Sequence, residues 1–425
     1  MGKLFGTDGI RGTAYQYPIT LEMAEKVGRA AARVFGGEPN ASVVVGRDPR
    51  VSGNDLISSV IKGCYESGLH VWDAGMIPTP GVAYLTSAYH AAVGIVISAS
   101  HNPYEDNGFK FFDKNGYKLS DEVEVQVERA ILADDPNEKK GSPGNVQLLK
   151  DGGKRYLSFL ADTWPKTLDL SGLHIVVDCA NGATSNIAPV LFEQLGAKVT
   201  ALFCAPNGVN INSGCGSEHT KVLLEKVKEI GADIGFAFDG DGDRLVAVDE
   251  KGEVLSGDQI LAIIADDMVK RGLLQNQTVV STIMSNVGLT VALKKMGAIH
   301  IKAGVGDRLV MEKMKETGAI LGGEDSGHMI FLSHHTTGDG MLSALRLLEP
   351  LRRSNKPLSQ LRNVMEPMPQ RLVNVPVKIK PPIQELKNLS QKIAEIESLL
   401  GDSGRVLVRY SGTQSICRVM VEGPT

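Results

Sequence analysis

Short apolar runs alternate with helix-like patterns along most of this 425-residue chain. Four of these runs are Val93–Ile97, His174–Asp178, Ile234–Phe238 and Thr278–Thr282. Continuous apolar runs of this length are typical of strands that are buried on both faces. Helical patterns separate the runs, at about Asp55–Glu66, Thr79–Ser87, Ser185–Leu195, Thr220–Glu229, Asp258–Lys270 and Asp307–Lys315. Helical connections between strands predict an α/β fold with mixed, mostly parallel sheets and helices on both faces.

The alternation restarts twice, so we predict three similar α/β/α units over residues 1–150, 151–252 and 253–366. A length prior of about 150 residues per domain also favours roughly three. The third unit is expected to end in a strand near Ala319–Leu321. A proline-rich stretch, Pro367–Pro382, then predicts a linker and an edge. One helix (about Ile383–Leu399) and two strands (Arg405–Arg409 and Cys417–Glu422) predict a small α+β domain over residues 367–425.

Charge and cysteine usage exclude several classes of protein. The net charge is −4 and no dense Lys/Arg block occurs, which argues against nucleic acid or anionic membranes as main partners. The five cysteines form no CxxC pair, so neither a disulfide framework nor a zinc site is expected. The N-terminus turns polar at once, and the apolar tract Val82–Ile97 is interrupted by polar residues. We therefore expect no signal peptide and no membrane span, and a cytoplasmic protein.

Three carboxylates alternate with glycines directly after the apolar run Ile234–Phe238: Asp239, Asp241 and Asp243. In a straight strand they would span about 13 Å, whereas one hard cation needs its oxygen ligands within about 2.0–2.6 Å. Gly240 and Gly242 allow the chain to curl without a steric penalty. The pattern predicts a divalent-metal loop at the carboxyl end of a strand, where ligands of α/β sheets usually bind.

Two other readings of this segment are a solvated turn and a calcium loop. Glu250 stands where the last ligand of an EF-hand would fall, but the sixth position, which needs glycine, holds Arg244. The following segment, Leu245–Asp249, alternates like a strand rather than a helix. These two departures disfavour the EF-hand.

Ser98-Ala99-Ser100-His101-Asn102-Pro103 follows the buried run Val93–Ile97. On its own the segment fits a capped turn, and no G-x-S-x-G elbow surrounds it. Beside a metal loop, however, a serine hydroxyl can carry a phosphoryl group whose oxygen serves as a further ligand. Ser100 is therefore a candidate phosphoryl carrier.

Three further loops carry polar groups. Gly322–His328 offers Glu324, Ser326 and His328 for hydrogen bonds to sugar hydroxyls, although a surface turn is the simpler reading. Residues 409–418 offer arginines, hydroxyls and a glycine suited to a phosphate, namely Arg409, Ser411, Gly412, Thr413 and Arg418. The segment Gly304–Arg308 is weaker, because it lacks the third glycine of a dinucleotide-binding loop.

The chain resembles the α-D-phosphohexomutase superfamily from Phe5 to Gly423. The resemblance is carried by the four loops in order, together with Phe5–Gly12, Asp178–Ala183, Asn210–Asn212 and Cys215–Ser217. It implies four domains in a heart shape around a central cleft. Gln414 stands where relatives often have Glu, Asp325 occupies a variable position, and relatives usually continue into a further helix beyond Gly423.

The resemblance implies the following roles. Ser100 is the phosphoserine, and it holds one Mg²⁺ together with Asp239, Asp241 and Asp243. Arg11, His101, Lys110 and Arg244 line the reacting site. Glu324, Ser326 and His328 bind the sugar, and Arg409, Ser411, Gly412, Thr413 and Arg418 bind the non-reacting phosphate. The general base is expected to be Lys110 or His101.

The implied reaction interconverts glucosamine 6-phosphate and glucosamine 1-phosphate, which feeds the synthesis of UDP-N-acetylglucosamine and cell wall precursors. Glucosamine or glucose 1,6-bisphosphate would act as activator, and the chain would be a monomer or homodimer. Phosphomannomutases and phosphoglucomutases share these loops and are the nearest alternatives. A sugar-phosphate-binding protein without catalysis and a phosphatase are alternatives from other classes.

Overall fold

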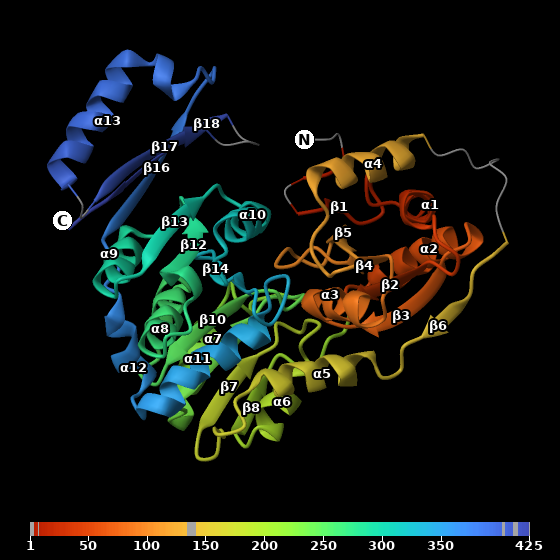
Figure 1. Ribbon diagram of the computed structural model, residues 1–425, viewed down its shortest axis with the longest axis horizontal. Helices are drawn as coiled ribbons and strands as arrows, with labels where there is room; N and C mark the ends of the chain where they lie inside the picture. The colour runs from red at the N-terminus through yellow and green to blue at the C-terminus, as the bar shows by residue number, and fades with distance from the viewer. Residues whose placement is uncertain (1–3, 7, 134–141, 402–403, 411–414, 425) are drawn as a thin grey trace.

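The computed structural model describes residues 4–6, 8–133, 142–401, 404–410 and 415–424. Its four sheets follow one another along the chain. Figure 1 shows them in an arc: the first unit lies at the right of the view, the second below, the third at the left and the C-terminal domain at the upper left. The first unit and the C-terminal domain form the two ends of the arc.

The first unit has a six-stranded sheet in the order β1-β5-β4-β2-β3-β6. β5 is antiparallel to β1 and β4, and the other pairs are parallel. The strands are β1 Ile10–Thr13, β2 Ser42–Arg47, β3 His70–Met76, β4 Val93–Ile97, β5 Asp106–Asp113 and β6 Val146–Leu148. The helices are α1 Leu21–Phe35, α2 Gly53–Glu66, α3 Thr79–Ala88 and α4 Asp121–Leu132. Every residue of β4 is buried, which accounts for its unbroken apolar sequence.

The second unit has the strand order β11-β10-β9-β7-β8. β7 pairs in parallel with β8 and β9, whereas β10 is antiparallel to both of its neighbours. The strands are β7 His174–Asp178, β8 Lys198–Leu202, β9 Ile234–Phe238, β10 Leu245–Asp249 and β11 Val254–Leu255. The helices are α5 Gly152–Thr163, α6 Ala188–Gln194 and α7 Lys221–Ile230. The loop between β9 and β10 is the Asp-Gly run.

The third unit has the strand order β13-β12-β14-β15, with β15 antiparallel to β14 and the other pairs parallel. The strands are β12 Thr278–Thr282, β13 Ile299–Ala303, β14 Leu321–Gly323 and β15 Met329–Phe331. The helices are α8 Gly257–Lys270, α9 Val287–Lys295, α10 Asp307–Thr317, α11 Gly340–Ser354 and α12 Leu358–Leu361, with 3₁₀ turns η1 Gln275–Gln277 and η2 Arg362–Val364. Ser256 and Gln259 form a capping box at the start of α8, which fixes where this helix begins.

The C-terminal domain, which we call the cap (residues 367–425), is an antiparallel sheet in the order β16-β18-β17. It contains β16 Gln370–Pro376, η3 Ile383–Glu385, α13 Lys387–Leu400, β17 Arg405–Tyr410 and β18 Ile416–Glu422. The predicted linker therefore contains a third strand. β16 lies at the sheet edge with all its residues exposed, and Pro376 is tolerated at its end for that reason.

One apolar core runs through the first three units, because residues from β4, β7, β9 and α11 belong to a single cluster. Stacked rings of Tyr84 and Phe159, with centroids 4.4 Å apart, join α3 to α5. The Tyr156 hydroxyl donates to Asp339 Oδ2 at 2.6 Å, which joins α5 to the start of α11. The three units are thus packed directly against one another.

The mixed α/β architecture with a small C-terminal domain agrees with the prediction. Besides the unpredicted strand β16, two predicted elements differ in their bounds. The predicted helix Ser185–Leu195 begins three residues later, at Ala188, because Ser185 Oγ donates to the Gly182 carbonyl within a turn. The strand predicted at Ala319–Leu321 begins only at Leu321. Within the part of the chain that the structure describes, no helix has the length and apolar character needed to cross a membrane.

Candidate active site

Ser100 lies in the turn after β4 and is 1% exposed. Its backbone has a φ of 55°, which is uncommon outside glycine and marks a residue held by its surroundings. Its amide donates to Ser98 Oγ at 2.9 Å. Its carbonyl accepts from Arg50 Nη2 at 3.0 Å and Asn212 Nδ2 at 2.9 Å. The serine is therefore held from both the first and the second unit.

Arg50 is fully buried, and sequence reasoning missed it. It donates to Asp48 Oδ2 at 2.9 Å and to the carbonyls of Asn102 and Asp106, both at 2.9 Å. A buried guanidinium with this many acceptors organises the loop around it. Arg50 stands in the turn between β2 and α2, and the sequence gives no sign that it reaches the serine loop.

The Asp-Gly run curls as predicted. Ligand atoms of Asp239, Asp241 and Asp243 all lie within 4.8 Å of one another, and all three residues are buried. Gly242 has a φ of 75°, which permits the turn. A Cβ on Gly240 would lie only 2.7 Å from the carbonyl oxygen of Ser100. Glycine at this position therefore lets the carboxylate loop approach the serine loop.

The structure brings the predicted serine and the predicted carboxylates together. Ser100 Oγ donates to Asp239 Oδ2 at 2.6 Å, across the boundary between the first and second units. The two residues are 139 positions apart in the chain. Their contact depends on β4 and β9 both ending at the same side of the molecule.

The pKa values of Asp239 and Asp243 are shifted in opposite directions. Burial raises the pKa of Asp239 well above its usual range, and the charges of Asp243 and Asp241 raise it further. Burial also opposes ionisation of Asp243, yet the charges of Lys110 and His328 hold its pKa well below the usual range. Like charges packed this closely need a cation to ionise together.

The donor set fits a hard divalent cation. Asp241 Oδ1 and Asp243 Oδ1 are buried and have no hydrogen-bond partner among the described residues. Buried carboxylate oxygens without partners are costly unless an ion or water satisfies them. Three carboxylates with a nearby serine oxygen form the all-oxygen set that Mg²⁺ prefers. This buried trio could therefore bind a metal ion.

Lys110, on β5, points into the carboxylate trio. Its Nζ lies 2.7 Å from Asp241 Oδ2 and 3.3 Å from Asp243 Oδ2. Although burial disfavours its charge, Asp241, Asp243 and Asp8 raise the pKa of Lys110. Thr79 Oγ1 also donates to Asp241 Oδ2, at 2.5 Å. In this arrangement Lys110 is a protonated cation rather than a base.

The other three predicted reacting-site residues surround the same point. Arg11, on β1, pairs with Asp8 and donates to the Ala99 carbonyl at 3.4 Å. His101 Nδ1 lies 3.4 Å from Ser100 Oγ. Burial lowers the pKa of His101, and the charge of Arg244 lowers it further. The amide of Arg244 donates to Asp239 Oδ1 at 3.2 Å.

The glycine-framed loop Gly322–His328, here called the sugar loop, lies directly beside the metal loop. The Leu245 amide donates to the Gly327 carbonyl at 3.0 Å. Ser326 is exposed, Glu324 is half-buried, and Glu324 Oε1 accepts from the Gly306 amide at 3.1 Å. Of the three predicted sugar-binding residues, Glu324 and Ser326 thus have surface available for a ligand.

His328 differs from the solvated histidine of a surface turn, because it is buried. Its Nδ1 lies 3.7 Å from Asp243 Oδ1 and its Nε2 lies 3.3 Å from Asp307 Oδ2. Burial opposes its charge, but Asp243 and Asp307 raise the pKa of His328. In this structure the ring joins the sugar loop to the carboxylate trio.

The predicted phosphate loop is only partly described, because Ser411, Gly412 and Thr413 lie outside the described residues. Arg409 on β17 and Arg418 on β18 are direct cross-strand partners. Like charges in that position destabilise a sheet, and within the described part of the cap neither arginine has a carboxylate partner. An anion between them would relieve the repulsion.

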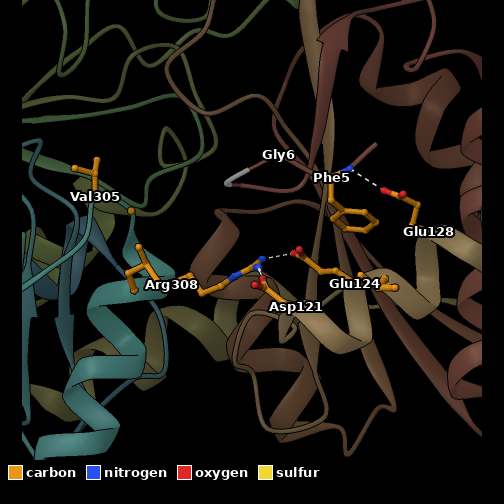
Figure 2. A pocket seen from close by; sticks show the side chains of 10 residues that line it. Phe5, Gly6, Asp121, Glu124, Glu128, Val305 and Arg308 are labelled. Atoms are coloured by element: carbon orange, nitrogen blue, oxygen red, sulfur yellow. Dashed lines mark hydrogen bonds and ion pairs between the residues drawn. The ribbon is translucent and has the colours of Figure 1, made fainter. Parts of the chain in front are cut away.

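Charged residues from the first and third units close over the site. Lys118 Nζ lies 2.5 Å from both Asp8 Oδ1 and Asp307 Oδ2. Arg308, on α10, reaches across to Asp121 and Glu124 at the start of α4 (Figure 2). We call the two contacts of Arg308, with Asp121 and with Glu124, the clasp.

A pocket lies beside the clasp, between the two units. Its lining is partly apolar, with Phe5, Val125 and Leu309 among the contributors. Figure 2 shows Phe5 on one side and Val305 on the other, with Arg308 between them. The weak motif Gly304–Arg308 therefore provides contacts between the units.

Four family models of the phosphoglucomutase/phosphomannomutase type match the chain in order. They are alpha/beta/alpha domain I at residues 2–138, domain II at 154–252, domain III at 256–368 and the C-terminal domain at 372–425. A solved phosphoglucomutase/phosphomannomutase family protein from Burkholderia thailandensis is 26% identical, with a TM-score of 0.83 over 99% of this chain and 93% of that chain. An N-acetylphosphoglucosamine mutase from Aspergillus fumigatus, at 17% identity and a TM-score of 0.67, shares the fold.

Curated relatives match at higher identity. A phosphoglucosamine mutase from Syntrophus aciditrophicus is 51% identical over 429 residues, covering 100% of this chain and 96% of the relative. A phosphoglucosamine mutase from Syntrophobacter fumaroxidans is also 51% identical, over 100% of this chain and 96% of the relative. With these relatives and four domain models in the expected order, the chain belongs to the α-D-phosphohexomutase superfamily, as an isomerase most like the phosphoglucosamine mutases.

Proposed function

We propose that this protein interconverts glucosamine 6-phosphate and glucosamine 1-phosphate through a phosphorylated Ser100 and a 1,6-bisphosphate intermediate. The observation that carries the proposal is the 2.6 Å contact between Ser100 Oγ and Asp239 Oδ2, because it unites the predicted phosphoryl carrier with the predicted metal loop. The full-length similarity to phosphoglucosamine mutases favours glucosamine over other hexoses.

In the proposed first step, a hydroxyl of the sugar monophosphate attacks the phosphorus on Ser100. The new sugar O–P bond forms as the Ser100 Oγ–P bond breaks, and the proton of the sugar hydroxyl finally neutralises Ser100 Oγ. The bisphosphate then turns around, and Ser100 takes back the phosphoryl group from the other position. Positioning and charge neutralisation carry the rate of such transfers.

Asp239, Asp241, Asp243 and the Ser100 side chain would hold one Mg²⁺, which offsets negative charge on the transferring phosphoryl group. Lys110, protonated among these carboxylates, lies within 2.7 Å of Asp241 and adds positive charge to the same place. Arg11, which donates to the Ala99 carbonyl, and Arg244 would stabilise the equatorial oxygens.

Of the two candidate bases, the geometry favours His101. Its ring nitrogen is 3.4 Å from Ser100 Oγ, and burial and Arg244 favour its neutral form by lowering its pKa. Lys110 would have to lose a proton that three carboxylates stabilise. His101 would therefore accept the proton of the attacking hydroxyl and return it to Ser100 Oγ.

The sugar loop and the cap would hold the rest of the substrate. Glu324 and Ser326 have the exposure needed to bind sugar hydroxyls, and His328 would position the loop against Asp243. Arg409 and Arg418, which are paired across the cap sheet and have no carboxylate partner among the described residues, would bind the non-reacting phosphate. Ser411, Gly412 and Thr413 are proposed to complete this phosphate site.

The experiment that tests the proposal is an assay on three sugars. The protein, with Mg²⁺ and catalytic glucose or glucosamine 1,6-bisphosphate as activator, is given the 1-phosphates of glucosamine, mannose and glucose in parallel. The highest kcat/KM should be on glucosamine 1-phosphate. A preference for mannose or glucose would contradict the glucosamine assignment, and phosphate release in excess of isomerisation would indicate a phosphatase.

We also propose that the protein acts in the cytoplasm, as a monomer or homodimer, on a small phosphosugar and without nucleic-acid or membrane partners. The net charge of −4 is consistent with this setting. Size-exclusion chromatography with light scattering would determine the oligomeric state. Retention of the protein on anionic vesicles or duplex DNA at physiological salt would contradict the expected partners.

A further inference from the structure

Asp258, in the first turn of α8, lies between the sugar loop and the cap. It is fully buried. Its amide donates to Asp325 Oδ1 at 3.2 Å, and the neighbouring Gly257 amide donates to the Asp325 carbonyl at 3.1 Å. On its other side, Asp258 Oδ2 accepts from the Asn286 amide at 2.6 Å. One residue thus touches both the sugar loop and the start of α9, which contacts the cap.

Asn286 continues the connection to the cap. Its Nδ2 donates to the Met368 carbonyl at 3.0 Å, and its Oδ1 accepts from the Met368 amide at 2.9 Å. Met368 stands just before β16, at the junction where the cap begins. A two-way amide contact of this kind fixes the position of that junction.

Two strands of the cap reach the same place. Glu422 on β18 is fully buried and accepts from Arg405 Nε at 2.7 Å and from the Val287 amide at 3.2 Å. Arg405 on β17 donates to the carbonyls of Ile283 and Ser285, both at 2.6 Å. The cap is therefore bound to the segment 283–287 through both strands, and Asp258 binds that segment from the opposite side.

Charged groups of both signs surround Asp258. Asp325 and Glu422 face it as negative groups, whereas Arg405 and Lys302 lie in the same neighbourhood as cations. Asp258 Oδ1 is buried and has no hydrogen-bond partner in the described part of the chain. Burial is the main cause that raises the pKa of Asp258 to about 7, and the charge of Asp325 contributes in the same direction. The hydrogen bond from the Asn286 amide partly offsets this rise by lowering the pKa. Its charge therefore changes in the physiological pH range.

We propose that Asp258 is a positioning residue that couples the sugar loop to the cap. The connection runs from Asp325 through Asp258 and Asn286 to Met368, and each step is a hydrogen bond given above. This inference rests on the proposed function in one respect, namely that the sugar loop and the cap bind the two ends of the substrate. It provides a physical route by which the position of the cap depends on the sugar loop.

The sign of the pH dependence follows from the raised pKa. Because the folded protein holds the Asp258 proton more tightly than an unfolded chain with a pKa of about 3.9, the stabilising contribution of the protonated form is complete below about pH 4. It is lost as the pH rises through the folded value of about 7. The junction between the third unit and the cap should be tighter at pH 6 than at pH 8.

Hydrogen exchange of the free protein tests this coupling without using activity. Asp258→Asn keeps an oxygen that accepts from Asn286 but cannot ionise. The ratio of wild-type to Asp258→Asn protection in peptides covering 405–410 and 416–422 should fall at least threefold from pH 6 to pH 8. Asp258→Ala, which removes the acceptor, should speed exchange of these peptides at least fivefold at both values.

Two controls keep the result specific. The control variant Asp233→Asn changes a carboxylate in the second unit, where Asp233 Oδ2 accepts from the His174 amide at 2.7 Å. Exchange of the cap peptides in this variant should match the wild type. The peptide covering β4 should exchange equally in all variants, which excludes general unfolding. The inference is overturned if Asp258→Ala leaves cap exchange unchanged, or if the wild-type to Asp258→Asn ratio does not depend on pH.

A kinetic measurement separates this inference from the proposed function. Asp258→Ala should lower kcat/KM for glucosamine 1-phosphate at least fivefold, with partial rescue in Asp258→Asn. A wild-type protein without mutase activity would contradict the proposed function, while the exchange measurement would still decide the coupling. Full wild-type kcat/KM in Asp258→Ala would overturn the coupling.

Discussion

Ser100 combines features that are hard to reconcile with a structural role. A buried serine with a left-handed backbone, whose hydroxyl donates to a carboxylate, is held in place by Arg50 and Asn212 from two different units. Backbone strain of this kind is costly and persists where the surroundings fix the residue for a purpose. The proposed purpose is to present one hydroxyl oxygen to the phosphoryl group and the metal.

Replacing Ser100 with alanine removes the proposed phosphoryl carrier. We expect turnover to fall by more than about 10³-fold, as for the loss of other covalent nucleophiles, while the affinity for glucosamine 6-phosphate changes little. A coupled assay and calorimetric titration measure the two quantities. Ser98→Ala, on a neighbouring hydroxyl that accepts from the Ser100 amide, serves as control and should retain measurable activity. Near wild-type turnover in Ser100→Ala would rule out the phosphoserine.

Removing the metal tests the carboxylate trio. Dialysis against a chelator should abolish activity, and Mg²⁺ should restore it, because the three carboxylates cannot all ionise without a cation. At a Mg²⁺ concentration of 100 times the dissociation constant, the folded state should gain about 2.7 kcal/mol, measurable as a rise in melting temperature. Asp243→Asn should shift the Mg²⁺ dependence at least tenfold. Full activity after exhaustive chelation would contradict a metal-dependent site.

At the scale of elements, strands that are buried on both faces were the most predictable. β4, β7, β9 and β12 match the predicted ranges because every residue, or all but the first, is buried. β16 was not predicted, since its sequence is proline-bounded and its side chains are exposed. Its place in the sheet depends on pairing with β18, a partner more than forty residues away.

In the site, too, local motifs were predictable and contacts between distant residues were not. The carboxylate trio and Ser100 were predicted because each forms a compact motif after a buried strand. The contacts of Lys118 and Arg308 were not, because they depend on how the first and third units pack against each other. Arg50 was also missed, because its contact with Ser100 joins two loops of the first unit that lie 50 residues apart in the chain. His328 was assigned to sugar binding from its loop, and only the fold places it beside Asp243.

The clasp between α10 and α4 should stabilise the contact of the first and third units. Arg308→Ala removes ion pairs to Glu124, which is largely buried, and to Asp121, which is exposed. We expect the free energy of unfolding to fall by about 1 kcal/mol, measured by urea denaturation, and the difference to shrink in 1 M salt. Lys313→Ala, on the same helix with a pair to Glu316 within α10, is the matched control and should change stability less. Equal effects of the two substitutions would contradict a clasp between units.

At the scale of the whole molecule, the arc of four domains places the cap opposite the first unit (Figure 1). In the proposed reaction a bisphosphate turns around between two transfers, and such a reorientation would require the arc to open and close. The cap is bound to the third unit chiefly near Met368 and segment 283–287. We infer that this junction acts as the hinge, in agreement with the proline-rich sequence from Pro367.

Solution scattering can detect this movement. Addition of glucosamine 1,6-bisphosphate should reduce the radius of gyration, because both phosphates engage the site only when the cap approaches the first unit. The Ser100→Ala variant allows the measurement without turnover. Superimposable profiles with and without saturating bisphosphate would contradict a moving cap.

The central claim is that a phosphoryl group resides on Ser100 and passes to the sugar. Peptide mass spectrometry after incubation with glucosamine 1,6-bisphosphate and Mg²⁺ tests it most directly. One phosphoryl group should appear on Ser100 within the tryptic peptide Gly63–Lys110. After the free bisphosphate has been removed by desalting, an excess of glucosamine 6-phosphate should remove this phosphoryl group as bisphosphate forms. Phosphate at another residue, or a Ser100 phosphate that the sugar cannot remove, would contradict this account.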